Sequence, residues 1–441
     1  MIKRHKSIYR KHRGIHRKRN KQLGILELIA IALGGMIGGG IFTVLGISVS
    51  MVGVFTPIAF MFGGLLAFLA AYSYVKLGVF YKDEGATYSF YKKTFPSSSF
   101  AASIIGWFVT FGYISTLALY AYTFASYAIS GFEFANSEWA RKVIAGIVIL
   151  IFTLVNLWSV KGMGKIEDLM VYTKLIILAI ISFVLINNTN TTIPTLIQNN
   201  GDLNILSIFI VASLTFVAFE GFQLVIHAIN EMEKPQINIP KAIYSAIFIT
   251  VLIYITIAIG AILAIPFENI IQNKEYALAS GADKILGHWG TDLVVLGALL
   301  ATSSAISGTL FGASRLMSVI AKDGYFPKFL LRKKKTIPVY SIITMAVLSF
   351  CLILVGDLKI ILEFGSVTFL LVSLLMAFAN FKIYKLTDSS LILTISAMIG
   401  LAIGTILIIY YELTTQIEQV YFILIIYTIL TFGAWLFSKI K

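Results

Sequence analysis

A cluster of glycines interrupts an apolar segment that is long enough to cross a membrane. The segment runs from Ile25 to Val54, and five of the seven residues from Gly34 to Gly40 are glycine. Each glycine in a helix interior costs roughly 1 kcal/mol relative to alanine, because the unfolded chain has more conformational freedom to lose. Backbone groups freed by a helix break find no water in lipid, so a break persists only where it is buried in protein or lines a cavity. The cluster therefore predicts a broken helix at a ligand site, with an unbroken helix that packs closely through small residues as the alternative.

Long apolar segments recur along the whole chain. Of its 441 residues, 58% are hydrophobic and 13% are charged, and each apolar run of about 18 or more residues is typical of a transmembrane helix. The strands of a porin-like barrel are about half as long and alternate in polarity, which excludes that architecture. We therefore expect an all-α integral membrane protein with twelve transmembrane helices. The predicted spans are 25–50, 56–80, 100–130, 141–159, 166–187, 203–231, 241–265, 290–320, 338–355, 359–383, 390–411 and 417–438.

Positive charge is concentrated at the beginning of the chain. Ten lysine and arginine residues precede the first span, and they account for most of the net charge of +14. Cytoplasmic flanks of transmembrane helices are enriched in these residues, so we expect a multi-pass protein of the plasma membrane with both termini in the cytoplasm. The basic tail, 1–24, is expected to contact anionic lipid rather than nucleic acid. No apolar core with a cleavage site follows it, as one would in a signal peptide.

A carboxylate and a glycine lie together near the centre of the sixth predicted span. Glu220 and Gly221 follow Phe216 and Phe219 and precede Phe222. A charged group in the middle of a membrane helix costs several kcal/mol unless it is paired, protonated or exposed to water. This position therefore indicates a second helix break.

The two predicted breaks lie in spans that are five helices apart. An odd number of spans per repeat turns the second repeat upside down in the bilayer, and matched breaks in the two halves are a signature of transporters built from inverted repeats. We expect inverted repeats of five helices each at 25–187 and 203–383, followed by two further helices at 390–438.

The residues around both breaks resemble one transporter family, the amino acid–polyamine–organocation (APC) superfamily. The run from Gly34 to Phe42 is similar to the G-x-G-I-F region of that superfamily. Further similar segments are its sixth span and the following loop, at 216–222, 231–235 and 239–243, and the loop after its eighth span, at 321–327. The resemblance is closest to the archaeal proton-coupled amino acid transporters of the superfamily. It implies a LeuT-like fold of ten core helices with helices 1 and 6 broken.

The peptide groups at the two breaks suit an amino acid zwitterion. N–H groups at the start of the helix after the first break carry partial positive charge and can hold a carboxylate. Carbonyl groups at the ends of the first half-helices can accept hydrogen bonds from an ammonium group. The phenylalanines could close over the substrate or could equally face lipid or the core. The predicted substrate-binding residues are Ile37, Gly38, Gly39, Gly40, Ile41, Phe216, Phe219, Glu220, Gly221 and Phe222.

Three roles are open for Glu220. It could pair with a cationic substrate side chain, carry a coupled proton, or cap unwound backbone. Superfamily sequences often have an uncharged residue at this position, so the resemblance assigns no role to it. Because loss of hydration disfavours the charged carboxylate, we favour a structural or proton-linked role over direct recognition of a basic amino acid.

Lys174 lies inside the fifth predicted span. It is about 12 Å from the cytoplasmic helix end at 1.5 Å per residue, and a lysine near a helix end can also extend its ammonium group to the membrane surface. The proton-coupled relatives have a lysine here. The resemblance implies that Lys174 bonds the carbonyl of Gly34 and a hydroxyl of Ser303 or Ser304. Loss of its proton would then release the first half of span 1 and couple proton movement to transport.

Other classes of function find little support in the sequence. The five histidines have no metal-ligand spacing, Cys351 is the only cysteine, and we find neither a phosphate-binding P-loop nor a catalytic constellation. We therefore expect a protein that is not an enzyme and that uses no metal or cofactor. The predicted function is secondary active transport of amino acids by alternating access with proton symport. The alternatives are exchange of amino acids or polyamines without net proton flux and, further from the pattern, a non-transporting membrane sensor of amino acids.

Overall fold

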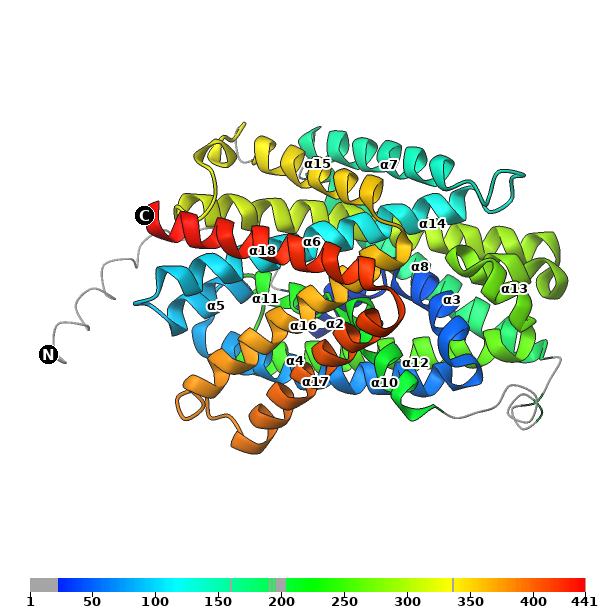
Figure 1. The fold of residues 1–441 in the computed structure, drawn as a ribbon, viewed down its shortest axis with the longest axis horizontal. Helices are drawn as coiled ribbons and strands as arrows, with labels where there is room; N and C mark the ends of the chain where they lie inside the picture. The colour runs from blue at the N-terminus through cyan, green and yellow to red at the C-terminus, as the bar shows by residue number, and fades with distance from the viewer. Residues whose placement is uncertain are drawn as a thin grey trace, which may run out of the picture.

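The computed structural model describes residues 23–158, 161–189, 192, 195, 204–334 and 337–440 (Figure 1). The basic tail, for which lipid contact is predicted, lies outside the described residues except for Leu23 and Gly24. The helices in chain order are α2 (Ile25–Met36), α3 (Gly40–Val52), η1 (Gly53–Phe55), α4 (Thr56–Tyr81), α5 (Ala86–Thr94), α6 (Ser99–Ala128), α7 (Glu138–Trp158), α8 (Lys161–Asn187), α10 (Ile205–Leu214), η2 (Phe216–Phe219), α11 (Leu224–His227), α12 (Pro235–Ala264), α13 (Phe267–Gln272), η3 (Lys274–Tyr276), α14 (Ala277–Lys322), η4 (Lys328–Leu331), α15 (Val339–Val355), α16 (Leu358–Lys382), α17 (Leu391–Thr415) and α18 (Ile417–Ile440).

Each predicted span coincides with helix in the described part of the chain. Among the described residues, nine helices are long and apolar enough to cross a membrane on their own, one of them formed by α3 and α4 joined through η1. Three shorter apolar helices, α2, α10 and α15, belong to the remaining predicted spans. α2 and α10 are short because each belongs to a span that breaks. The predicted all-α integral membrane architecture is therefore confirmed.

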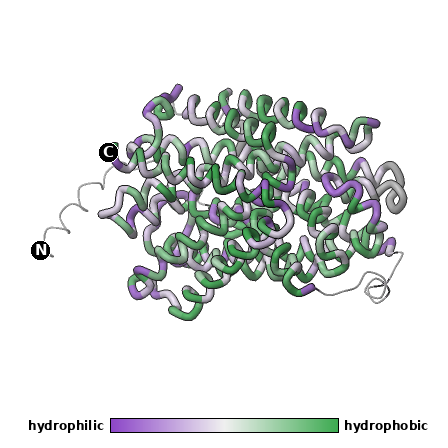
Figure 2. Tube along the Cα trace, in the orientation of Figure 1, coloured by the Kyte–Doolittle hydropathy of each residue, from purple (hydrophilic) through white to green (hydrophobic). Residues whose placement is uncertain are grey.

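α6 lies in the interior of the bundle and α18 at its surface. In α6, 83% of the most apolar window is buried inside the protein, against 22% in α18. α18 exposes large apolar side chains such as Leu424 and Phe432, which suits a helix whose outer face meets lipid rather than water. Figure 2 shows hydrophobic residues along the long helices and hydrophilic residues gathered at many of their ends.

The two broken spans lie side by side among four long helices. α12 packs against α2, α4 and α8, α14 packs against α6 and α8, and α16 packs against α6 and η2. α11 packs against α2, so the ends of the two broken spans are in contact. Figure 1 shows α2, α11 and α16 in the middle of the molecule.

We name the two ends of the bundle after the short helices that lie there. α5 lies at the left end in Figure 1, and α13, followed by η3, lies at the right end. α13 and η3 both pack against α3, whereas α5 packs against α6 and α16. The α13 end and the α5 end are therefore covered by different segments.

Candidate functional site

The first break separates α2 from α3. α2 ends at Met36, Ile37 leaves the helical conformation with ψ of 69°, and α3 begins at Gly40. Among the backbone hydrogen bonds of the described residues, none uses the N–H of Gly38, Gly39 or Gly40, whereas the N–H of Ile41 donates to the Tyr254 hydroxyl. The three glycine donors lie at the positive end of α3. Free N–H groups at the start of a helix are suited to binding an anion.

The second break separates α10 from α11. α10 ends at Leu214, η2 follows, and Glu220 then adopts an extended conformation with ψ of 152°. Gly221 has φ of +120°, a conformation that side chains strongly disfavour. Ser366 of α16 stabilises the end of α10, because its hydroxyl donates to the Leu214 carbonyl at 2.5 Å.

The two breaks touch through their glycines. A Cβ atom placed on Gly221 would lie 2.5 Å from the carbonyl carbon of Gly35, and one on Gly35 would lie 2.6 Å from Leu224 Cδ1. Both distances are far below van der Waals contact. Glycine at both positions therefore allows α2 and the start of α11 to approach backbone to backbone.

Tyr254 of α12 joins the breaks by hydrogen bonding. Its hydroxyl lies 3.0 Å from the Met36 carbonyl and 2.9 Å from the Ala218 carbonyl. A hydroxyl carries one proton, so the two carbonyls share a single donor. Tyr254 is fully buried, and its contacts hold the end of α2 beside η2.

Lys174 of α8 lies at the end of α2. Its Nζ donates to the Gly34 carbonyl at 3.0 Å and to Ser304 Oγ at 3.1 Å. The side chain is fully buried, so the ammonium group does not extend to the membrane surface. Ser303, the other predicted partner, precedes Ser304 and is partly buried. Lys174 thus connects α8, α2 and α14 at one point.

A cavity extends from the second break toward the α5 end. Its empty volume, which includes solvent at the open mouth, is about 440 Å³. The cavity is narrow in this conformation. It is lined by residues of α2, α6, the α11 region, α14 and α16. They are Gly35, Tyr113, Thr116, Tyr120, Glu220, Gly221, Gln223, Leu224, His227, Gly308, Thr309, Gly312, Ala313, Leu316 and Phe369.

Glu220 and Gly221 are the predicted substrate-binding residues that line this cavity. Residues 38–40 are packed against neighbouring helices instead. A Cβ atom on Gly38 would lie 2.7 Å from Ala305 Cβ and 2.8 Å from the ring of Tyr120. Tyr120 therefore packs against Gly38 and Gly39, whereas Ala218 and Tyr254 pack against Gly40.

The three predicted phenylalanines are fully buried in the core. The ring centroid of Phe219 lies 5.2 Å from that of Tyr254, and the centroid of Phe222 lies 5.4 Å from that of Tyr74. Phe216 lies in the same core cluster. In this conformation they support the break from behind and do not line the cavity.

Reasoning from the sequence did not single out Tyr120, Tyr254 or the glycines of α14. Tyr120 faces the first break from α6, with its hydroxyl 3.3 Å from the Gly35 carbonyl. Gly312 faces open space, because a Cβ atom there would meet nothing within 4 Å. Tyrosines inside apolar spans were a usable signal, since a buried hydroxyl needs a partner. Which break each one serves is visible only in the fold.

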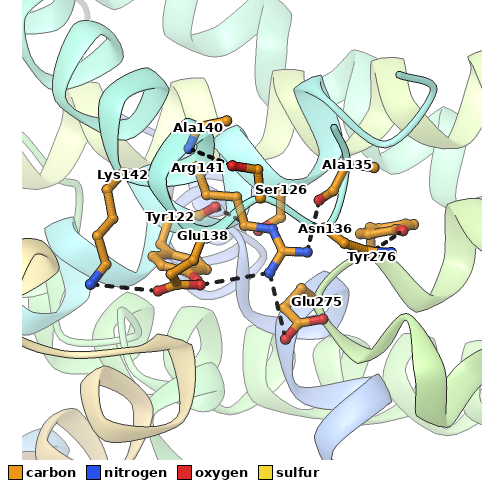
Figure 3. A network of polar contacts seen from close by, with 11 residues as sticks. Tyr122, Ser126, Ala135, Asn136, Glu138, Ala140, Arg141, Lys142, Glu275 and Tyr276 are labelled. Atoms are coloured by element: carbon orange, nitrogen blue, oxygen red, sulfur yellow. Dashed lines mark hydrogen bonds and ion pairs between the residues drawn. The ribbon is translucent and has the colours of Figure 1, made fainter. Parts of the chain in front are cut away.

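A polar network closes the α13 end (Figure 3). Arg141 Nη1 lies 3.7 Å from Glu275 Oε1 and 3.8 Å from Glu138 Oε2, and its Nη2 donates to the Ala135 carbonyl at 2.8 Å. Tyr122 of α6 donates to Glu138 Oε2 at 2.5 Å. The network connects η3, α7 and α6.

Glu275 belongs to η3, and η3 lies directly on α3. A Cβ atom on Gly46 would lie 2.1 Å from the Lys274 carbonyl oxygen. The side of α3 that leads from the first break to the α13 end is therefore covered.

Different contacts hold the α5 end. Tyr88 and Lys92 of α5 both donate to Asp323 Oδ2, at 2.7 and 2.6 Å. His227 lines the cavity, and its Nδ1 atom is 2.6 Å from the Glu84 carbonyl oxygen. The loop before α5 thus borders the cavity mouth.

The loop before α5 is itself held by Asp83. Burial alone would raise the pKa of the Asp83 carboxyl, but hydrogen bonds from Lys93 and the Gly85 N–H outweigh it and hold the pKa below its ordinary value.

This architecture defines a class of protein. A membrane helix bundle with two interrupted helices in contact, unpaired helix-terminal N–H groups and a buried lysine is organised to bind a small polar solute within the membrane. It is the architecture of a membrane transporter.

The chain belongs to the amino acid permease family, which it matches over residues 23–435. It is 30% identical over 319 residues to the uncharacterized protein MJ0609 of Methanocaldococcus jannaschii, covering 71% of this chain and 72% of that protein. It is 28% identical over 357 residues to the inner membrane transport protein YbaT of Escherichia coli, covering 80% and 81%. It is 24% identical over 376 residues to the branched-chain amino acid permease BcaP of Bacillus subtilis, covering 80% and 79%.

Family membership confirms the predicted superfamily and the prediction that the protein is a transporter of amino acids and not an enzyme. The closer likeness to the archaeal proton-coupled members stays a prediction.

Proposed function

We propose that this permease is a secondary active transporter that binds an amino acid between the two helix breaks and releases it alternately at the two ends of the bundle. The observation that carries this proposal is the group of three backbone donors at residues 38–40, which make no backbone hydrogen bond among the described residues. A carboxylate is the natural complement of such a helix start. The adjacent second break supplies the other wall of the site.

Binding in this mode requires Tyr120 to move. Its ring lies against Gly38 and Gly39, so it occupies the place where the substrate carboxylate would meet the donors. Its hydroxyl holds the Gly35 carbonyl at 3.3 Å, a long and weak hydrogen bond. Rotation of this side chain would free both the donors and a carbonyl able to accept from the substrate ammonium group.

Proton coupling is assigned to Lys174. As an ammonium group it donates to both α2 and α14. A neutral amine has one donor fewer and no charge, so both contacts weaken when the proton leaves. Protonation of Lys174 would therefore bias the position of α2 through its contacts with Gly34 and with Ser304 or its neighbour Ser303. A change in the position of α2 would in turn change access to the cavity.

The remaining parts of the proposal follow the sequence. Residues 25–187 and 203–383 form inverted repeats in a LeuT-like arrangement, followed by the pair of helices within 390–438. The protein lies in the plasma membrane with both termini in the cytoplasm, and the basic tail contacts anionic lipid. The α5 end would then face the cytoplasm.

Uptake into proteoliposomes tests the proposal. With an acidic exterior and no internal substrate, the purified protein is expected to accumulate a labelled amino acid, and dissipating the pH gradient is expected to stop accumulation. Lys174→Ala should lose the pH-driven component while still binding substrate. Lys382→Ala, at the far end of α16, is the matched control and should behave as the unmodified protein.

The exchange alternative gives a different result. A strict exchanger stays silent in vesicles without internal substrate and becomes active once an amino acid is loaded inside. If pH-driven accumulation survives in Lys174→Ala, Lys174 does not couple proton movement to transport. That result would not contradict the proposed substrate site.

A further inference from the structure

A buried carboxyl at the second break has no basic partner among the described residues. Glu220 is 3% exposed, and neither of its carboxylate oxygens accepts a hydrogen bond from the described residues. The Glu220 side chain lines the cavity described above. We propose that Glu220 binds a cationic group on the substrate side chain, an ammonium or guanidinium, so that the preferred substrates are basic amino acids. This inference rests on the proposed transport function and names its substrate class. It replaces the structural or proton-linked role favoured from the sequence, because the structure places Glu220 in the lining of a cavity.

The polar side chains beside the Glu220 carboxyl are Gln223 and Ser373, and neither carries a charge. The side-chain oxygen of Gln223 accepts from the Gly221 N–H at 3.0 Å, and its amide group donates to the Tyr113 hydroxyl at 3.4 Å. Ser373 of α16 lies near the carboxyl but makes no hydrogen bond in this conformation. A serine hydroxyl can supply one hydrogen bond and no charge.

The titratable groups around Glu220 cannot neutralise it. They are three buried tyrosines, Tyr74 of α4 and Tyr113 and Tyr120 of α6, and a tyrosine is neutral or negative. His227 lines the same cavity and is committed to the Glu84 carbonyl. The ion pairs of the described residues do not include Glu220.

Another buried carboxyl of the bundle shows the contrast. Glu363 of α16 is fully buried and, like Glu220, accepts no hydrogen bond. It lies 3.5 Å from Lys359 Nζ, one helical turn away. Glu363 therefore has a cation supplied by the protein, whereas Glu220 faces a cavity. An uncompensated buried charge is strongly destabilising, so a cationic group of the substrate beside Glu220 would stabilise its charged form.

The α14 wall of this narrow cavity is at least as long as an extended amino acid side chain. This wall runs from Gly308 to Leu316, about 12 Å at 1.5 Å per residue. The lining residues on this wall are Gly308, Thr309, Gly312, Ala313 and Leu316. Gly312 leaves open space. With the substrate carboxylate at residues 38–40, an extended side chain would pass the contact of the two breaks and bring its charged end to Glu220.

Paired substrates test the inference. Binding to the purified full-length protein would be measured by calorimetry for L-lysine against the uncharged L-norleucine, and for agmatine, which keeps the guanidinium group of arginine but lacks the carboxylate. The unmodified protein should bind lysine at least about tenfold more tightly than norleucine, since hydrogen bonds to a charged group contribute more than neutral ones. Glu220→Gln should lose that preference and keep norleucine binding within about threefold of the unmodified protein.

Two variants serve as controls. Glu363→Gln removes a buried carboxyl outside the cavity and should leave the lysine preference unchanged. Glu220→Asp keeps the charge and should retain part of the preference, so it distinguishes loss of charge from a folding defect in Glu220→Gln. Size-exclusion profiles of all variants verify folding.

The possible results separate the two hypotheses. Tighter binding of norleucine than lysine, or a Glu220→Gln variant that lowers both affinities equally, overturns the basic-substrate inference and leaves amino acid transport in place. Binding of agmatine but of neither amino acid supports the cation site and rejects recognition of a zwitterion. Failure of all three to bind rejects both.

Discussion

Both helix breaks contain glycine, but the space beside them differs. The first break is filled, because Tyr120 and Ala305 pack against Gly38. The second break opens on a cavity and presents the carboxyl of Glu220, which forms no ion pair among the described residues. Backbone donors recognise the carboxylate that all amino acids share, whereas a side chain at the second break can distinguish one amino acid from another. If the proposed function holds, general recognition and side-chain selectivity belong to separate halves of the site.

The largest expected effect comes from the contact that joins the halves. Gly221→Ala places a Cβ atom 2.5 Å from the Gly35 carbonyl carbon at a φ of +120°. Strain and overlap together should destabilise the protein by about 3 kcal/mol or more and abolish transport, as measured by thermal unfolding and uptake. Gly131→Ala is the matched control, since its Cβ atom would meet nothing within 4 Å. Normal uptake by Gly221→Ala would show that the breaks need not touch.

A smaller effect is expected from the hydrogen bond that spans both breaks. Tyr254→Phe removes the donor shared by the Met36 and Ala218 carbonyls, and a buried carbonyl left without a donor costs about 1–3 kcal/mol. The melting temperature and the uptake rate should both fall. Tyr244→Phe, on the same helix, is the control, because the hydrogen bonds of the described residues do not include its hydroxyl. Equal behaviour of the two variants would mean that Tyr254 does not hold the breaks together.

The smallest effect is expected at the loop that borders the cavity mouth. Hydrogen bonds keep the pKa of Asp83 below its ordinary value, so its contribution to stability is present above the ordinary carboxyl pKa and is lost as the pH falls through the lowered value. Because Asp83 and Lys93 are partly exposed, the contribution should be below about 1 kcal/mol. Melting temperatures measured from pH 6 down to about pH 3 should show a shallower decline in Asp83→Asn. An identical pH profile would show that this pair does not stabilise the loop.

Particular residues show why the sequence predicted part of the site. The position of both breaks followed from local chemistry, because glycine at 34–40 and Glu220–Gly221 disfavour a continuous helix wherever the segment lies. The contacts of Lys174 were implied by the family resemblance, and the structure places its Nζ within hydrogen-bonding distance of Gly34 and Ser304. The orientation of the phenylalanines was open, since an aromatic side chain suits lipid, core and ligand alike, and only packing placed all three in the core.

The sequence by itself determined the membrane class, the number of spans and the interruption of two of them, because hydropathy and glycine content act within a single segment. Tertiary structure alone decided that Tyr120 covers the first break, that Tyr254 joins the two, and that Glu220 faces a cavity without a cation. These properties depend on residues far apart in the sequence, such as Gly35 and Tyr120 or Met36 and Tyr254, which are 85 and 218 positions apart. Burial and pairing arise only when several helices pack together, so no local pattern encodes them.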